Sequence, residues 1–491
     1  MKKMSTSVKV GAQQVKFKMT TPIPEGIEVP DQVSSRLGTL KFFDGFPDDA
    51  TTDKLYDNLD FQRAVQAYLL GLPAVSMNAM RKGLLEWGPA NANLLTWETL
   101  VDSRTLGLTG NCNTAYSMMW IDLSSGPVVT VIPSRVLGFF NDLWSRYVAD
   151  VGMVGPDKGE GGKYLVLPPG YQGAVPDGYI VVKSTTNECW LFYRHFDVDG
   201  DFRPAIGTLK RNARIYLLSQ ANNPPAINFL NLSGKEFHSI APSDYRYWEY
   251  LNEVVQGEPS DSSDKVSLGY FASIGIEKGK PFSPDARMKK ILTEAAAVGD
   301  ATARAITYKL RQKENRFNKN SSWRPFFIVG YKYESQPGVL DMDAYISCYF
   351  SGIGMSPAED VEIIGKGSQY AWISTDAKGN LLKGDKNYRL HMPPGIPVKD
   401  FWSIILYDTQ TRSFLQTDQQ YPMVSSQNKG IIINPDKSVH IYFGPESPVG
   451  KENNWIQTIP GKSWFAMLRL YGPLEPWFDK TWRPGEIELV K

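Results

Sequence analysis

Residues 109–133, TGNCNTAYSMMWIDLSSGPVVTVIP, predict the unit around which the fold is built. They join an Asn-rich loop to an aromatic strand, a Ser-Ser-Gly-Pro turn and a second apolar strand. Both strands are apolar enough to be buried, whereas the loop before them is polar. We therefore expect a buried β-hairpin with polar groups at its mouth, where a ligand can bind.

The composition is that of a globular protein with several domains. The chain has 491 residues, of which 42% are hydrophobic and 21% charged. Its 53 basic and 52 acidic residues leave a net charge of +1, so no global field attracts nucleic acid or an anionic membrane. No apolar run approaches the ~20 residues of a membrane span, and the N-terminus lacks the apolar core of a signal peptide. We therefore expect neither a nucleic-acid nor a membrane partner, and a cytoplasmic location by default.

The spacing of apolar residues divides the chain into five segments. Apolar residues recur every three or four positions where we expect helices and alternate with polar ones where we expect strands. The expected segments are an extended arm (1–52), a helical segment (53–93), an antiparallel β-sandwich (94–235), a helical domain (236–322) and a compact antiparallel sandwich of jelly-roll type (323–491). The fold class is therefore mainly β with a helical insert.

Several elements can be placed more closely. We expect a helix over 54–87, kinked or divided at Pro73, and a second helix with Ser283 as its N-cap that bends or ends at Gly299. The pattern at 136–149 does not decide between helix and strand. The expected strands of the first β domain are 117–123, 128–132, 163–167, 178–183 and 189–196.

Motifs in both halves of the chain resemble a known pair of domains. The N-terminal motifs are NCNTAY at 111–116, WIDL at 120–123, GPVV at 126–129 and GGKYLVLPPGY at 161–171, followed by Arg194. The C-terminal motifs are DFWSI at 400–404, YD at 407–408, NW at 454–455 and RLYGP at 469–473. The chain is identified as a member of the uncharacterised proteins that join domains of unknown function of families 1254 and 1214. The resemblance implies an immunoglobulin-like sandwich, an inserted helical domain and a C-terminal jelly roll, without an established reaction.

Motifs for metal, nucleotide or serine chemistry are missing from the sequence. It contains no HExxH, GxSxG or phosphate-binding GxxxxGK. A zinc site of three histidines would need nearly all of His195, His238, His391 and His440 to converge, so we expect no metal and no cofactor. The three cysteines, which form no CxxC pair, are expected to be reduced and mostly buried: Cys112, Cys189 and Cys348.

Polar residues at the predicted hairpin are the first candidate site. Asn111, Asn113 and Thr114 either hold a tight turn or present amide and hydroxyl groups to a ligand. Tyr116 and Trp120 follow them on the strand. Asp122, Arg194 and His195 are candidate catalytic residues. Asp122 can instead be a buried acceptor for Arg194, as a structural pair, whereas Arg194 and His195 can bind an anion or supply a general acid.

The second candidate set combines aromatic groups with one amide and one guanidinium. Such groups suit stacking on sugars or rings, and packing between two sheets explains them equally well. The set is Trp402, Asn454, Trp455, Arg469 and Tyr471.

Two functions follow from these candidates. The first is a hydrolase or lyase acting on a glycan, ester or related organic substrate in a cleft between the two β domains. The alternative is a non-enzymatic ligand-binding or assembly protein with β-sandwich recognition surfaces. In either case we expect a small-molecule or glycan ligand and a homo-oligomer formed through the arm and the helical insert.

Overall fold

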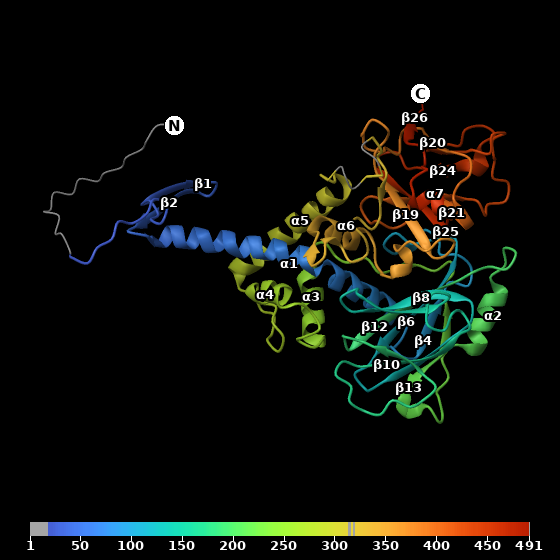
Figure 1. The fold of residues 1–491 in the computed structure, drawn as a ribbon, viewed down its shortest axis with the longest axis horizontal. Coiled ribbons are helices and arrows are strands. Elements are labelled where there is room, and N and C mark those ends of the chain that lie inside the picture. Colours follow the sequence, from blue (N-terminus) through green and yellow to red (C-terminus); the bar gives the residue numbers. More distant parts are fainter. Residues whose placement is uncertain (1–17, 313–315, 318–319, 491) are drawn as a thin grey trace. The chain divides into compact units, whose positions relative to one another are not determined.

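The computed structural model describes residues 18–312, 316–317 and 320–490 (Figure 1). The chain forms two compact units, Met1–Asp60 and Phe61–Lys491. In the first unit, strands β1 (Gln32–Ser35), β2 (Gly38–Phe43) and β3 (Phe46–Pro47) make an antiparallel sheet within the segment expected to be an extended arm. The part of that expectation that concerns residues 1–17 lies outside the described residues.

The long helix α1 (Asp49–Leu85) starts earlier than predicted and is continuous through Pro73. The Asp48 carboxylate caps its start by accepting the Thr51 N–H at 2.8 Å. A proline inside a helix removes one backbone hydrogen bond. We attribute the unbroken course to packing, because Leu72 and Ala74 on either side of Pro73 are buried in the core of the second unit.

The first β domain contains two sheets. The six-stranded sheet has the order β14-β4-β6-β12-β8-β9, and the four-stranded sheet has the order β11-β10-β7-β13. The strands are β4 (Asn93–Thr96), β6 (Ala115–Asp122), β7 (Val128–Ile132), β8 (Val136–Asp142), β9 (Tyr147–Gly152), β10 (Gly162–Leu167), β11 (Ile180–Lys183), β12 (Glu188–His195), β13 (Arg214–Leu217) and β14 (Asn228–Asn231). The undecided segment 136–149 is thus the pair β8 and β9.

The expected hairpin of β6 and β7 does not form, because the two strands belong to different sheets. Strand β6 pairs with β4 and β12, whereas β7 pairs with β10 and β13. The turn between them carries the chain from one sheet to the other, and apolar side chains of both sheets share one buried cluster. The expectation of purely antiparallel pairing is also wrong, since β10–β11 and β4–β14 are parallel. A helix that was not predicted, α2 (Arg203–Asn212), adds Ile206 and Leu209 to the same cluster.

The helical segment near 246–308 is confirmed. It contains α3 (Arg246–Gly257), α4 (Lys265–Ser273) and α5 (Ala286–Tyr308). Asp285, not Ser283, is the N-cap of α5, and its carboxylate accepts the Met288 N–H at 2.7 Å. The helix continues through Gly299, where a Cβ atom would lie 2.5 Å from the Tyr68 ring of α1. Glycine at this position therefore allows two helices to pack closely rather than ending one of them.

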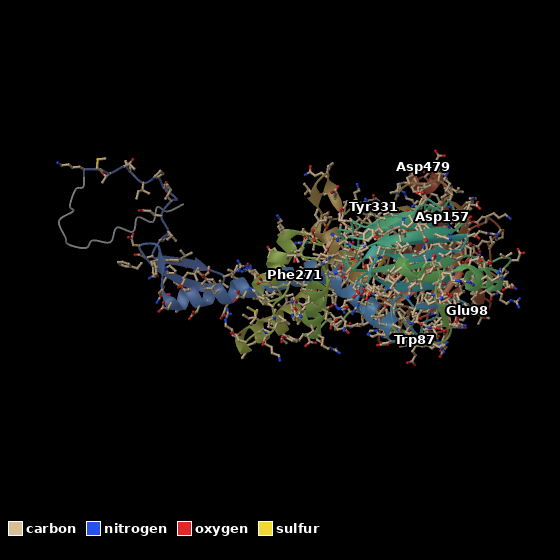
Figure 2. All side chains as sticks on the ribbon, turned by 90° about the horizontal axis from the view of Figure 1, so that it is seen from below. Trp87, Glu98, Asp157, Phe271, Tyr331 and Asp479 are labelled. Atoms are coloured by element: carbon tan, nitrogen blue, oxygen red, sulfur yellow. The ribbon has the colours of Figure 1, made fainter. Side chains whose placement is uncertain are left out.

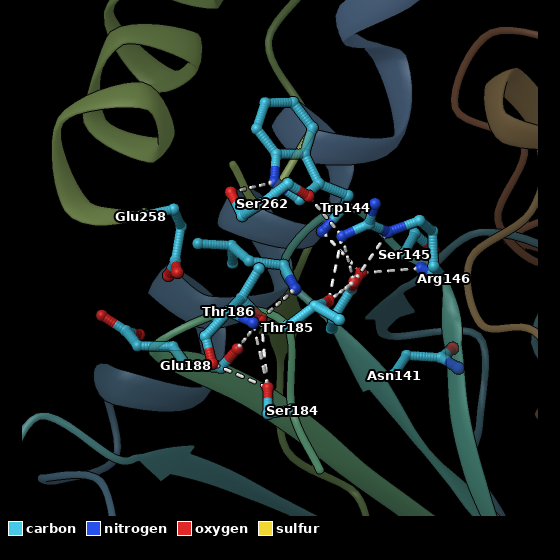
Figure 3. A network of polar contacts seen from close by, with 12 residues as sticks. Asn141, Trp144, Ser145, Arg146, Ser184, Thr185, Thr186, Glu188, Glu258 and Ser262 are labelled. Carbon is cyan, nitrogen blue, oxygen red and sulfur yellow. Dashed lines mark hydrogen bonds and ion pairs between the residues drawn. The ribbon is translucent and has the colours of Figure 1, made fainter. Parts of the chain in front are cut away.

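A polar network ties the turn between β8 and β9 to this helical segment (Figure 3). Asp142 accepts the backbone N–H groups of Trp144 and Arg146, each at 2.9 Å. The same two residues reach Ser262: Trp144 Nε1 donates to its hydroxyl at 3.0 Å, and Arg146 Nη2 to its carbonyl at 2.5 Å. The Trp144 ring also stacks on Phe271 of α4, which is labelled in Figure 2, with ring centroids 6.3 Å apart.

Glu258 lies beside this network and is 2% exposed (Figure 3). Its carboxyl group accepts the Asn187 N–H at 2.5 Å. Burial raises the pKa of Glu258 to about 8, because the charged form loses its hydration.

The C-terminal domain also contains two main sheets, a five-stranded sheet of order β16-β19-β25-β21-β22 and a four-stranded sheet of order β24-β23-β20-β26. Their apolar side chains form a second buried cluster. The strands are β16 (Arg324–Pro325), β19 (Ser368–Ile373), β20 (Tyr388–Met392), β21 (Val398–Asp408), β22 (Met423–Ser425), β23 (Val439–Gly444), β24 (Trp455–Gln457), β25 (Trp464–Pro473) and β26 (Ile487–Leu489).

The sequence predicted β structure throughout this domain, and that prediction is wrong. Helices α6 (Met342–Ser351) and α7 (Glu475–Phe478) interrupt it. Most of α6 is buried, so its sequence lacks the apolar stripe that marks a surface helix. The fold as a whole is mixed α/β, with several sheets and seven α-helices in the described ranges.

Two further features concern the whole of the described chain. All three cysteines are free and buried, as expected. Among the helices of residues 18–312, 316–317 and 320–490, none has the length and apolarity that crossing a membrane requires.

Candidate ligand site

An inner cavity of about 90 Å³ lies between the six-stranded sheet of the first β domain and the five-stranded sheet of the second. Side chains alternate along a strand, so one face of each sheet is available to the cavity. Its walls are mostly aromatic and methionine side chains, and three charged residues join them: Arg194, Glu359 and Arg469. The aromatic walls include Trp97, Tyr116, Phe139, Trp190, Phe192, Phe237, Phe326, Phe327, Tyr370 and Phe414.

Arg194 of β12 pairs with Glu359 of the C-terminal half of the chain. Its Nη2 donates to Glu359 Oε1 at 2.8 Å, and the two side chains are only 8% and 12% exposed. The Tyr370 hydroxyl donates to the same carboxylate oxygen at 2.9 Å and lies 2.6 Å from Ser368 Oγ. The Nε of Arg194 is buried and has no hydrogen-bond partner among the described residues. Arg194 therefore has one free donor in this polar cluster.

Arg469 of β25 is buried, at 4% exposure. It donates to the Tyr407 hydroxyl at 3.0 Å, to the Gly110 carbonyl at 3.2 Å and to the Thr109 carbonyl. Its guanidinium carbon lies 4.9 Å from the centre of the Tyr370 ring. No carboxylate in the described part of the chain lies within ion-pair distance of it. A positive charge is thus buried at the cavity without a counter-ion.

Tyrosine hydroxyls lie near both guanidinium groups. Burial raises the pKa of Tyr116 to about 12 and holds that of Tyr370 well above 10, although the two arginines act in the opposite direction. Both phenols therefore keep their protons at neutral pH. They can donate a hydrogen bond but are poor bases.

The Asn-rich loop holds its own turn and hydrogen-bonds two tyrosines, Tyr116 and Tyr471. Asn111 Oδ1 accepts the Asn113 N–H at 2.7 Å, and Asn111 Nδ2 donates to Thr114 Oγ1 at 3.1 Å. The same amide donates to the Tyr471 hydroxyl at 2.6 Å, while the Asn111 N–H donates to Tyr116 at 3.0 Å. The structural role considered for this loop is therefore confirmed, and Asn111 links both β domains behind the cavity.

Asn113 makes a second link between the domains. Its Nδ2 donates to Ser425 Oγ at 3.1 Å and to Gln427 Oε1 at 3.0 Å. Its Oδ1 is buried without a partner among the described residues.

The expected pair of Asp122 with Arg194 does not form. In the register of β6 and β12, Arg194 lies opposite Tyr116 and Asp122 lies opposite Glu188. Six residues of strand separate the two positions, roughly 20 Å. Asp122 instead accepts the Ser124 N–H at 2.8 Å.

His195 points to the opposite face of the sheet from Arg194. Its Nε2 lies 2.8 Å from Ser117 Oγ, and burial lowers its pKa to about 4, so it is neutral at pH 7. The structure therefore does not bring Asp122, Arg194 and His195 together.

The remaining predicted residues lie outside the cavity walls. Trp120 donates from Nε1 to Glu188, and Trp402 is buried between the two C-terminal sheets. Asn454 Nδ2 donates to the carbonyls of Ile432 and His440 at 2.9 and 2.8 Å. Trp455 Nε1 donates to the Gly444 carbonyl at 3.0 Å.

Two of the four histidines meet. His391 and His440 face each other across β20 and β23, with ring centroids 5.1 Å apart. Among the described residues no group of three or more metal-binding side chains comes together.

Sequence reasoning missed Glu359, Tyr370 and Tyr407. The nearest signal is the glycine turn before Glu359, where Gly354 has φ +90° and a Cβ atom would lie 2.8 Å from Phe139. That turn shows that the backbone approaches an aromatic wall closely. The turn does not show that the Glu359 carboxylate, which follows it in the sequence, pairs with Arg194.

Comparisons with known proteins match both halves of the chain. A family described as "Protein of unknown function (DUF1254)" matches residues 92–217, and one described as "Protein of unknown function (DUF1214)" matches residues 367–475. These matches confirm the resemblance seen in the sequence motifs. No curated protein matches the chain.

One solved structure with a TM-score above 0.5 shows the same fold. The crystal structure of the VPA0106 protein from Vibrio parahaemolyticus is 19% identical, with a TM-score of 0.54, over 88% of this chain and 100% of that one. An uncharacterised protein from Burkholderia cenocepacia is 13% identical, with a TM-score of 0.40, over 90% of this chain and 97% of that one. At 19% identity the likeness to the Vibrio protein shows the fold alone.

Proposed function

We propose that this protein, which joins a DUF1254 domain at residues 92–217 to a DUF1214 domain at residues 367–475, binds a small organic anion in the inner cavity. The observation that carries the proposal is Arg469, a buried guanidinium without a carboxylate partner among the described residues. Burying an unbalanced charge is costly, and a bound carboxylate would supply the missing negative charge. Nε and Nη2 of Arg469 already donate to Tyr407, Thr109 and Gly110, so a carboxylate would be bound through Nη1 by a charge-assisted hydrogen bond.

The cavity walls indicate the rest of the ligand. Phe192, Phe237 and Phe326 offer apolar surface, while Arg194 and Arg469 offer positive charge. The volume of about 90 Å³ is smaller than the roughly 150 Å³ of an apolar cavity that binds benzene. The apolar part is therefore smaller than an aromatic ring with its surrounding space, and a short alkyl chain suits it.

Hexanoate and its uncharged analogue hexan-1-ol test the proposal. We expect hexanoate to raise the unfolding temperature of the wild type in a saturable way and hexan-1-ol to have a much smaller effect. At about 100 times its Kd a ligand adds about 2.7 kcal/mol to the free energy of unfolding, which a thermal shift detects. Calorimetric titration then gives the Kd. Equal responses to the acid and the alcohol would show that no anion is recognised.

Arg469→Met should abolish the response to hexanoate. The matched control is Arg389→Met, because Arg389 lies on β20 of the same domain, outside the cavity, and is 42% exposed in its pair with Glu488. Arg469→Lys should bind more weakly than the wild type but measurably, since it keeps the charge and loses the planar fork. Circular dichroism checks that each variant is folded. Full binding by a folded Arg469→Met variant would refute the proposal.

A hydrolase or lyase acting on a glycan, ester or related substrate is the second candidate. It is favoured by the hydrogen-bonded series Tyr370–Glu359–Arg194 in the cavity wall. Burial holds the pKa of Tyr370 well above 10, and its hydroxyl already donates to Glu359, so this phenol is a weak general acid and a poor base at neutral pH. Binding therefore has the better support. Hydrolysis of a hexanoate ester by the wild type but not by Tyr370→Phe would reverse this preference.

We also propose that each pair of sheets is a sandwich, immunoglobulin-like in the first β domain and of jelly-roll type in the second. The support is that each sheet pair shares one buried apolar cluster.

A further inference from the structure

A second, outer cavity of about 500 Å³ follows the inner one along the same strands. On the chain of β12, Arg194 lines the inner cavity and Phe196, just beyond the strand, lines the outer one. On β25, Arg469 lines the inner cavity and Tyr471 the outer one. Residues two apart on a strand face the same side, so each pair marks one step from the inner to the outer cavity.

Strand β8 shows the same order, because Phe139 lines the inner cavity and Leu137 lines the outer one. A small gap of about 10 Å³ lies at this step and is lined in part by Leu137 and the Arg194–Glu359 pair. The gap shares Leu137 with the outer cavity and the ion pair with the inner one. These residues therefore lie between the two cavities, at the place that we call the constriction.

The outer cavity carries an excess of positive charge. Arg135, Lys366 and Lys399 line it, are exposed, and lie outside ion-pair distance of any carboxylate in the described ranges. Two carboxylates also line it, Asp197 and Asp400. Asp197 is turned toward its own loop, where its Oδ2 accepts the Gly200 N–H at 2.7 Å. Positive groups at the rim of a cavity raise the local concentration of anions and the rate at which they arrive.

We infer that the outer cavity is an encounter site for the organic anion, which then passes Leu137 and the Arg194–Glu359 pair to reach Arg469. This inference rests on the proposed function of the inner cavity. The charge of Glu359 does not close the route to an anion, because Arg194 balances it at 2.8 Å. The Arg194 side chain lines this gap and places positive charge beside the route.

The kinetics of hexanoate binding test the encounter site. Trp97 and Trp190 line the inner cavity, so tryptophan fluorescence in a stopped-flow instrument reports arrival there. Replacing both lysines, Lys366→Gln with Lys399→Gln, should lower the association rate constant about threefold to tenfold at low salt and leave the dissociation rate constant unchanged. The difference should shrink as salt is added. The control is Lys163→Gln with Lys183→Gln, at two exposed lysines on the four-stranded sheet.

The constriction is tested at Leu137. Leu137→Ala should speed association and dissociation together by severalfold, and Leu137→Trp should slow both, with the Kd nearly unchanged. Hexanoate binding with wild-type rates in all these variants would place the entrance elsewhere and overturn the inference, while leaving the proposed function intact. Failure of hexanoate to bind the wild type at all would refute the proposed function itself and the inference with it.

Discussion

Breaking the Arg194–Glu359 pair should destabilise the protein strongly. The two side chains are only 8% and 12% exposed and lie 2.8 Å apart, so either change leaves a charge buried without its partner. Removing one member of such a pair costs about 3–5 kcal/mol, whereas replacing both members by neutral groups is often close to neutral. We therefore expect this loss for Arg194→Met and for Glu359→Gln. We expect a much smaller loss for the double variant.

Urea unfolding, followed by circular dichroism and by tryptophan fluorescence, measures the four proteins of this double-mutant cycle. The matched control is the exposed pair Arg389–Glu488, whose side chains are 42% and 59% exposed and whose atoms lie 3.2 Å apart. The same substitutions there should change stability by at most about 1 kcal/mol. Losses below about 1 kcal/mol at Arg194 and Glu359, or losses that add in the double variant, would refute the buried pair.

Two further predictions concern the helical segment and the N-terminal sheet. Burial raises the pKa of Glu258 from 4.5 to about 8, so the folded protein holds a proton that the unfolded chain releases. The stabilisation of the folded state that comes from this bound proton is complete below about pH 4.5 and is lost as the pH rises to about 8. Glu258→Gln should reduce this slope in urea midpoints, and an unchanged slope would refute the assignment. Phe43 and Phe46 are 84% and 77% exposed, and we propose that they contribute to a homo-oligomer. Light scattering should show that Phe43→Ser with Phe46→Ser dissociates it, and a monomeric wild type would rule it out.

The sequence predicted strands well where apolar and polar residues alternate within a short stretch. Strand β7 has the expected bounds, and the four other expected strands, now β6, β10, β11 and β12, are shifted by one or two residues, whereas β4, β13 and β14 were not predicted. Pairing was not predictable in the same way, because nothing in residues 109–133 states that β6 and β7 join different sheets. Helix α6 was missed for a related reason, since a helix buried on most sides has no apolar stripe to recognise.

The candidate site was predictable in part. The motifs point to Asn111, Tyr116, Arg194, Arg469 and Tyr471, which the structure gathers at or beside the inner cavity. Glu359 could not be chosen from the sequence, because it lies 165 residues from Arg194 along the chain. Asp122 was chosen wrongly for the opposite reason, because it lies near Tyr116 in the sequence. Along the strand, however, it is roughly 20 Å from the position opposite Arg194.

The hydrogen bonds of Arg469 have a consequence for whether these two regions can fold apart. The side chain comes from the DUF1214 region, and the carbonyls of Thr109 and Gly110 that it binds come from the DUF1254 region. Either region expressed alone would have an aromatic face open to water and would lack part of the cavity wall. The two regions should therefore depend on each other to fold.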